Sequence, residues 1–203
     1  ASHLGRPKGK RDLKQSLAPV ARRLEELIKH KVRFAPDCVG AEVQRMADGL
    51  PPGEILLLEN LRFHDAEEKN DPIFSRELAR LADLYVDDAF GSAHRAHASV
   101  EGTARLFKEP AAGLLMDKEL KYLEAALHSP RRPLLAIIGG AKVSSKIGVL
   151  KNLLNTVDSL AIGGGMCFTF YKAQGYGIGK SLCEDDFVDE AKKLLGKPKF
   201  HLP

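Results

Sequence analysis

Apolar residues recur at helical spacing in some stretches of the chain and form short unbroken runs in others. Helical spacing predicts helices, whereas short apolar runs between glycine, proline or polar residues are typical of buried strands. The expected helices cover residues 16–32, 41–50, 72–83, 144–157 and 167–174. The expected strands cover residues 32–39, 55–58, 84–86, 134–140 and 159–165. Strand and helix therefore alternate, which predicts parallel sheets with helices on their faces.

Several helix ends carry local signals. Asp71 before Pro72 is typical of a helix start, because the carboxylate accepts from free N–H groups and proline lacks one. Gly49 is typical of the residue that ends a helix. Residues 114–129 form a helical stretch of about four turns that stops at Ser129 and Pro130. We expect this stretch to connect two α/β parts.

Composition narrows the class of protein. The 203 residues are 44% hydrophobic and 29% charged, as in ordinary soluble domains, and no apolar run approaches the roughly 18 residues of a membrane span. The three cysteines form no CxxC pair, and the opening residues lack the apolar segment of a secretory signal. We therefore expect a protein of a reducing, cytoplasmic compartment. The net charge of +4 suits anionic small molecules as well as nucleic acid.

Basic side chains follow three strand ends in the first part of the chain: the opening residues, which resemble the end of a strand, and the expected strands at 55–58 and 84–86. Ligands of open parallel sheets bind at the carboxyl ends of the strands, so these side chains are candidates for a shared anion site. The residues at these ends are His3, Leu4, Gly5, Arg6, Arg62, His94, Arg95 and His97. The i, i+3 histidines would also suit a metal, but the arginine between them argues against a cation. Taken alone, Arg62 fits an ordinary surface position, and only the convergence of three strand ends favours a ligand site.

The second part has glycine-rich turns after two strands, and two lysines follow the first turn. Glycine lets a backbone approach a phosphate closely, although such turns are also common packing devices. Neither turn matches GxxxxGK[ST] or GxGxxG. Lys142 and Lys146 are four residues apart and are expected on one face at the start of a helix. The helix dipole disfavours each there by roughly 0.3–1 kcal/mol, which a bound polyphosphate would offset.

Five stretches resemble the signature sequences of the phosphoglycerate kinase family, and they occur in that family's order: SHLGRP, LLENLRF, DDAFGSAHRAHAS, GGAKVSSKI and IGGGMCFTF. The stretch GLLMDKELKYL is similar to the family's interdomain helix, and the resemblance covers nearly the whole chain. It implies two Rossmann-like parallel-sheet domains of three α/β/α layers, both incomplete here. Residues 1–113 would bind phosphoglycerate, 114–129 would form the interdomain helix, and 130–203 would bind nucleotide.

The same resemblance implies an activity and residue roles. The family transfers a phosphoryl group reversibly from 1,3-bisphosphoglycerate to ADP, giving 3-phosphoglycerate and ATP. Lys142, Arg6 and Arg95 would be catalytic. Substrate would bind at His3, Leu4, Gly5, Arg6, Arg62, His94, Arg95 and His97. Nucleotide would bind at Gly139, Gly140, Ala141, Lys142, Lys146, Gly163, Gly164 and Gly165.

The resemblance also implies Mg²⁺, bound together with ADP or ATP, with no metal ligand in this chain. The chain has about half the family's usual length, so we expect either a fragment or the ordered part of a longer chain. One alternative is an inactive remnant that only binds anions. A nucleic-acid module is disfavoured because tryptophan is absent and aromatic residues make up only 6%. We expect no nucleic-acid or membrane partner, and a monomer when the chain is complete.

Overall fold

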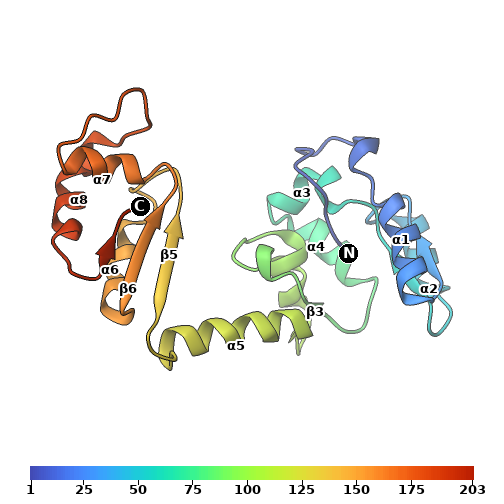
Figure 1. Cartoon of the computed structure of the whole chain (residues 1–203). Helices are drawn as coiled ribbons and strands as arrows, with labels where there is room; N and C mark the ends of the chain where they lie inside the picture. The colour runs from blue at the N-terminus through green and yellow to red at the C-terminus, as the bar shows by residue number, and fades with distance from the viewer. The chain divides into compact units, whose positions relative to one another are not determined.

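The computed structural model describes residues 1–203, and internal contacts divide the chain into two compact units. Unit 1 comprises Ala1–Leu120 and unit 2 comprises Lys121–Pro203, so the division falls within helix α5 (Leu114–His128) (Figure 1). α5 covers the stretch for which the sequence predicts a connecting helix. None of the helices is long and apolar enough to cross a membrane.

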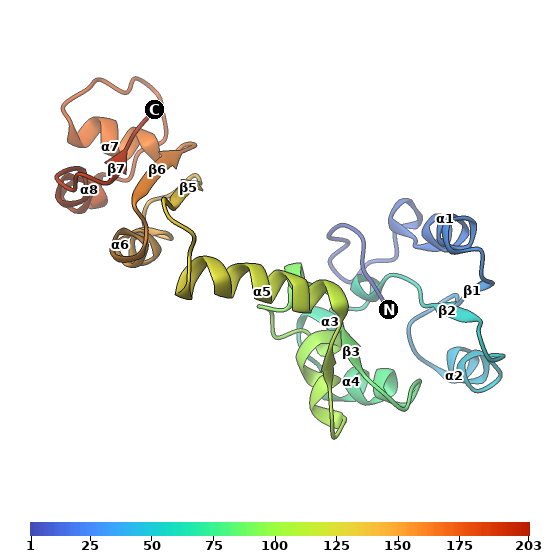
Figure 2. The ribbon, with the colours of Figure 1, turned by 60° about the horizontal axis from the view of Figure 1, so that its bottom comes forward.

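Unit 1 contains two separate pairs of parallel strands. β1 (Val32–Phe34) pairs with β2 (Ile55–Leu57), and β3 (Val86–Asp87) pairs with β4 (Ala111–Ala112). The helices before α5, labelled in Figure 2, are α1 (Ala18–Ile28), α2 (Ala41–Asp48), α3 (Asp65–Glu68) and α4 (Pro72–Ala79). Single turns of 3-10 helix cover Leu13–Gln15, Leu61–Phe63, Phe90–Ser92 and Ala104–Leu106, and a π-helix covers Ala98–Gly102. The parallel pairing confirms the predicted sheet type.

The start of α4 follows its sequence signal. The Asp71 carboxylate accepts hydrogen bonds from the backbone N–H groups of Ile73 and Phe74 at 2.9 and 2.8 Å. Pro72 occupies the first position of the helix, where its missing N–H costs nothing. The predicted helix start at this position is therefore confirmed.

The strand expected at residues 84–86 lies further along the chain. β3 begins only at Val86, and Leu84 is exposed instead of buried in a sheet. A ladder extends only as far as its partner strand, and β4 is two residues long. Because β4 has too few residues for a periodic pattern, the hydrophobic spacing gives no sign of it.

Two apolar clusters stabilise unit 1. In one, Val43 of α2 and Phe74 of α4 are buried together with Leu58, which directly follows β2. In the other, Ala21 of α1 packs with Val32 of β1. Both clusters anchor the β1–β2 pair, and this fixes the chain that leaves β2.

Unit 2 is built on a three-stranded parallel sheet in the order β5-β6-β7. Its strands are β5 (Leu135–Gly139), β6 (Ser159–Gly163) and β7 (Phe200–His201). Its helices are α6 (Ile147–Thr156), α7 (Cys167–Ala173) and α8 (Val188–Leu195), with a 3-10 turn at Asp185–Phe187. The predicted strands at 134–140 and 159–165 are confirmed, and the register places Gly139 opposite Gly163.

The packed face of this sheet carries the alternate residues of each strand. Leu160 and Ile162 of β6 are buried with Leu150 of α6 and Phe170 of α7. Ile137, on the opposite face of β5, is 71% exposed. The core thus holds β5, β6 and their helices in place, and it aligns the two glycine turns that follow the strands.

Candidate functional site

Three basic side chains of unit 1 lie close enough to His3 to affect it electrostatically, and together with His3 we call them the basic cluster: His3, Arg62, Arg95 and His97. Burial lowers the pKa of His3, and electrostatic interactions with Arg62, His97 and Arg95 lower it further, whereas Glu68 raises it. The four residues come from three separate loops. Clustered guanidinium and imidazole groups favour an anionic ligand.

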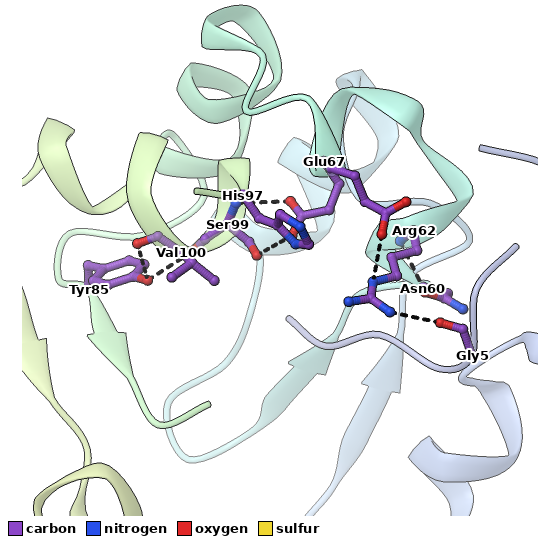
Figure 3. A network of polar contacts seen from close by, with 9 residues as sticks. Gly5, Asn60, Arg62, Glu67, Tyr85, His97, Ser99 and Val100 are labelled. Atoms are coloured by element: carbon purple, nitrogen blue, oxygen red, sulfur yellow. Dashed lines mark hydrogen bonds and ion pairs between the residues drawn. The ribbon is translucent and has the colours of Figure 1, made fainter. Parts of the chain in front are cut away.

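Arg62 is fixed by contacts on both sides of its guanidinium. It lies in the 3-10 turn after β2, where the Asn60 side chain accepts a hydrogen bond from the Arg62 backbone N–H at 3.1 Å. Figure 3 shows Arg62 Nη1 donating to the Gly5 carbonyl at 3.0 Å, and Nε also forms an ion pair with Glu68 at 3.7 Å. The side chain is only 7% exposed. Arg62 is therefore a buried, oriented cation rather than a loose surface arginine.

The loop of residues 1–6 reaches Arg62 without forming a strand. The Leu61 N–H donates to the Ser2 carbonyl at 3.1 Å, and the Asn60 amide donates to the Leu4 carbonyl at 2.8 Å. Gly5 has a φ of +65°, which favours glycine at this bend. The sequence indicates that His3 follows the end of a strand, whereas residues 1–6 contain no strand. Hydrogen bonds to the turn after β2 hold this loop in place.

His97 is held by Glu67 and by the loop around Ser99. It is buried, and its Nδ1 lies 3.8 Å from a carboxylate oxygen of Glu67 on α3. The same carboxylate accepts hydrogen bonds from the backbone N–H and the hydroxyl of Ser99, at 2.9 and 2.5 Å. The Tyr85 hydroxyl donates to the Ser99 carbonyl at 2.8 Å (Figure 3). A hydrogen-bond network thus fixes the loop that carries His97.

The remaining predicted residues of unit 1 are less closely held. His94 and Arg95 line a hollow of 530 Å³ that also includes the acidic residue Glu101. Arg6 and Leu4 are exposed, and the Arg6 side chain forms no hydrogen bond or ion pair. The structure therefore brings four of the predicted cations together and leaves Arg6 at the surface.

The two glycine turns of unit 2 pack against each other. Gly164 has a φ of +73°, and a Cβ there would lie 2.9 Å from the Gly140 carbonyl oxygen. The Met166 N–H donates to that same carbonyl at 2.8 Å. Glycine is thus required at position 164 for contact between the two backbones, whereas a Cβ on Gly140 would meet only Met166 Sδ at 3.7 Å and one on Gly163 would meet nothing within 4 Å. The space beside Gly163 is open.

The placement of both lysines on one face of a helix is wrong. α6 begins at Ile147, so Lys146 precedes its first residue and Lys142 lies in the loop after β5. The fully buried Val143 anchors this loop in the core, and its carbonyl accepts from the Lys146 N–H at 2.8 Å. A turn therefore precedes the helix, and helical spacing does not relate the two ammonium groups.

Glu184 is a charged neighbour of this loop that the sequence does not reveal. Its carboxylate accepts hydrogen bonds from the Ser144 backbone N–H at 2.9 Å and from the Ser144 hydroxyl at 2.6 Å. These bonds hold the pKa of Glu184 below its usual value, and the charge of Lys142 contributes least. Glu184 and Ser144 are 40 residues apart, and no spacing links them. The lysine loop therefore has an anion beside it within the protein itself.

One group of potential metal ligands lies elsewhere in unit 1. Ligand atoms of Asp37, Cys38 and His64 lie within 4.8 Å of one another. His64 Nε2 is already 2.6 Å from Asp37 Oδ1, and the Cys38 thiol donates to the Glu59 carbonyl at 3.0 Å. Burial raises the pKa of the Cys38 thiol, which disfavours the thiolate that a metal needs. Hydrogen bonding accounts for this group without a metal.

Comparison with known proteins gives one consistent family. The sequence matches phosphoglycerate kinase over residues 1–203. Phosphoglycerate kinase of Solibacter usitatus (strain Ellin6076) is 63% identical over 197 residues, which are 97% of this chain and 50% of that protein. "Phosphoglycerate kinase 3, cytosolic" of Arabidopsis thaliana is 59% identical over 198 residues, which are 98% and 49% of the two chains.

Solved structures agree with the sequence comparison. Phosphoglycerate kinase from Coxiella burnetii matches with a TM-score of 0.74 at 44% identity, over 100% of this chain and 51% of that one. The enzyme from Pyrococcus horikoshii OT3 matches with a TM-score of 0.80 at 29% identity, over 99% and 53%. The chain thus spans about half the length of the relatives it matches, and its mixed α/β class with parallel sheets is confirmed.

Proposed function

This chain belongs to the phosphoglycerate kinase family, and we propose that it carries ligand-binding residues of an enzyme that reversibly transfers a phosphoryl group from 1,3-bisphosphoglycerate to ADP. The products are 3-phosphoglycerate and ATP. The observation that carries the proposal is the basic cluster, in which Arg62, His97 and Arg95 lie near enough to His3 to act on it electrostatically. Phosphoryl transfer depends mainly on positioning and charge neutralisation, and clustered cations serve both.

In unit 1 the basic cluster binds the phosphate and carboxylate groups of phosphoglycerate. Arg62 is suited to this role because a buried guanidinium is poorly hydrated and its planar fork matches phosphate oxygens. Arg6 and His94 are exposed, so they are free to turn toward the ligand. Leu4 and Gly5 contribute through the loop that carries His3. We assign to Arg6 and Arg95 contacts with the substrate that become stronger in the transition state of phosphoryl transfer.

In unit 2 the loop after β5 and the turn after β6 bind the nucleotide phosphates. Lys142 stays in contact with the phosphoryl group while it is transferred. Lys146, just before α6, neutralises a neighbouring phosphate. The α6 N-terminus adds free N–H groups that favour an anion. Gly163 leaves open space beside its turn. Gly139, Gly140, Ala141, Gly164 and Gly165 shape the two turns around it.

Magnesium enters this proposal with the nucleotide. Bound with the nucleotide, it would supply positive charge that neutralises the phosphates during transfer. Glu184 is the carboxylate beside the lysine loop, and Ser144 occupies both of its oxygens. We therefore assign no Mg²⁺ ligand to these residues, and we derive no catalytic step from the ion.

The domain roles follow the same division: residues 1–113 bind phosphoglycerate, 114–129 connect the domains, and 130–203 bind nucleotide.

The alternative function is an inactive remnant that only binds anions. The matching relatives are named phosphoglycerate kinase, and this does not favour that alternative. We propose a cytoplasmic monomer without nucleic-acid or membrane partners. The cytosolic name of the Arabidopsis relative supports the compartment.

A coupled assay tests the activity. The protein is prepared at the full length of its relatives with these 203 residues included, and ATP formation from ADP and 1,3-bisphosphoglycerate is followed. We expect turnover that saturates in both substrates and requires Mg²⁺. Absence of turnover in a folded preparation would refute the proposed function. Binding of 3-phosphoglycerate without turnover would instead support the anion-binding remnant.

A further inference from the structure

Both loops that carry proposed ligand-binding cations are held by a glutamate in the same way. In unit 1, Glu67 accepts from the backbone N–H and the hydroxyl of Ser99, two residues after His97. In unit 2, Glu184 accepts from the same two groups of Ser144, two residues after Lys142. Two hydrogen bonds to a single residue restrain its backbone and its side chain together. The residue two positions earlier is thereby restrained as well.

Glu67 has a further contact that Glu184 lacks. Its carboxylate lies 3.8 Å from Nδ1 of His97, and both side chains are at most 10% exposed. The neighbouring Glu68 forms an ion pair with Arg62 at 3.7 Å. Figure 3 shows the Glu67 carboxylate next to His97 and Ser99, with Arg62 nearby. The acidic turn of α3 therefore contacts two members of the basic cluster that are far apart in sequence.

We propose that Glu67 is a positioning residue for phosphoglycerate binding, acting through His97 and the loop that Ser99 closes. The inference rests on the proposed function of the basic cluster. A buried carboxylate that accepts two hydrogen bonds leaves the loop few alternative conformations. With Nδ1 turned toward Glu67, the other ring nitrogen of His97 is available to the ligand. A displacement of about 1 Å in such a group is enough to weaken binding severely.

The variant Glu67→Gln tests this role because it keeps the shape of the side chain and removes its charge. The amide has one acceptor oxygen instead of two and no charge, so one bond to Ser99 is lost and the electrostatic contact with His97 is weakened. We expect KM for phosphoglycerate to rise about tenfold, the effect of losing a hydrogen bond to a charged group. KM for the nucleotide, which binds in the other unit, should stay within about twofold.

A stability control separates positioning from folding. Asp71→Ala weakens α4 of the same unit without touching the basic cluster, and it should lower the melting temperature while leaving both KM values unchanged. If Glu67→Gln changes the KM for phosphoglycerate no more than Asp71→Ala does, the inference is wrong. Should Glu67→Gln fail to fold, Ser99→Ala removes only the hydroxyl contact and is expected to raise the same KM by a smaller factor.

A double-mutant cycle tests whether Glu67 acts through His97. In the background of His97→Ala, Glu67→Gln should raise KM for phosphoglycerate little further, because residues of one network are not additive. A full additional tenfold rise would refute action through His97. Wild-type protein without turnover would refute the proposed function, whereas an active wild type with an unaffected Glu67→Gln variant would refute the positioning role alone.

Discussion

Replacing Arg62 by alanine should affect ligand binding more than folding. The guanidinium is 7% exposed and belongs to the basic cluster, so an anionic ligand would meet it largely desolvated. Loss of such a charge-assisted pair costs about 2–5 kcal/mol, or roughly 30- to 4,000-fold in Kd. We expect 3-phosphoglycerate affinity to fall by that factor, and nucleotide affinity to stay nearly unchanged.

The cost to folding comes from contacts within the protein. Arg62 Nη1 donates to the Gly5 carbonyl, and a hydrogen bond from a charged donor contributes about 1.5–3 kcal/mol. The Glu68 side chain is 40% exposed, so water solvates it after the ion pair is lost and that pair adds little. Urea unfolding should therefore show a loss at the lower end of this range.

Calorimetric titration with 3-phosphoglycerate and with ADP measures both affinities in one preparation. Arg62→Lys keeps the charge without the fork and should give an intermediate Kd. Arg23→Ala, an exposed arginine of α1 with an i, i+3 partner, is the matched control and should leave both affinities unchanged. If Arg62→Ala unfolds more easily but binds 3-phosphoglycerate normally, Arg62 only anchors the loop at Gly5, and its assignment to the ligand site is wrong.

Three further outcomes follow from the structure. Lys142→Ala should lower kcat far more than it raises KM for nucleotide, measured by steady-state kinetics, because its contact strengthens in the transition state; an unchanged kcat would exclude a catalytic role. Asp71→Ala removes the α4 cap and should cost about 0.5–2 kcal/mol in urea unfolding, and no loss would contradict the capping geometry. Lys151 and Lys193 lower the pKa of Glu190 from 4.5 to about 2, so its stabilising contribution is present above pH 4.5 and is lost as pH falls toward 2. Glu190→Gln should flatten the dependence of unfolding on pH across that interval, and an unchanged slope would contradict the pairing.

The class of the fold could be predicted because it depends on local periodicity. The alternation of Leu160 and Ile162 with smaller residues marks a strand with one packed face, and the structure buries both side chains. The Asp71–Pro72 start of α4 is equally local, since the cap reaches only two and three residues ahead. The short strand β4 was missed because two residues carry no period.

The basic residues of the candidate site could be proposed from the sequence, but its acidic residues could not. Arg62 and His97 follow expected strands, and their positive charge suggests a ligand. Glu67 and Glu184 lie in ordinary acidic stretches, and their partners are 32 and 40 residues away. No repeat or spacing connects such pairs, so only folding reveals that these carboxylates hold the loops of the site.

By itself the sequence determined the parallel α/β class, the helix over residues 114–128 and the basic side chains that come after β2 and β3, because these depend on short-range patterns. Tertiary structure alone decided how those side chains are presented. It placed Lys142 in a loop instead of a helix, since the buried Val143 anchors a turn before α6. It also explains why residue 164 is a glycine, because the Gly140 backbone approaches too closely for any Cβ at that position. Contacts between distant segments set both outcomes, and a linear pattern of residues does not encode such distances.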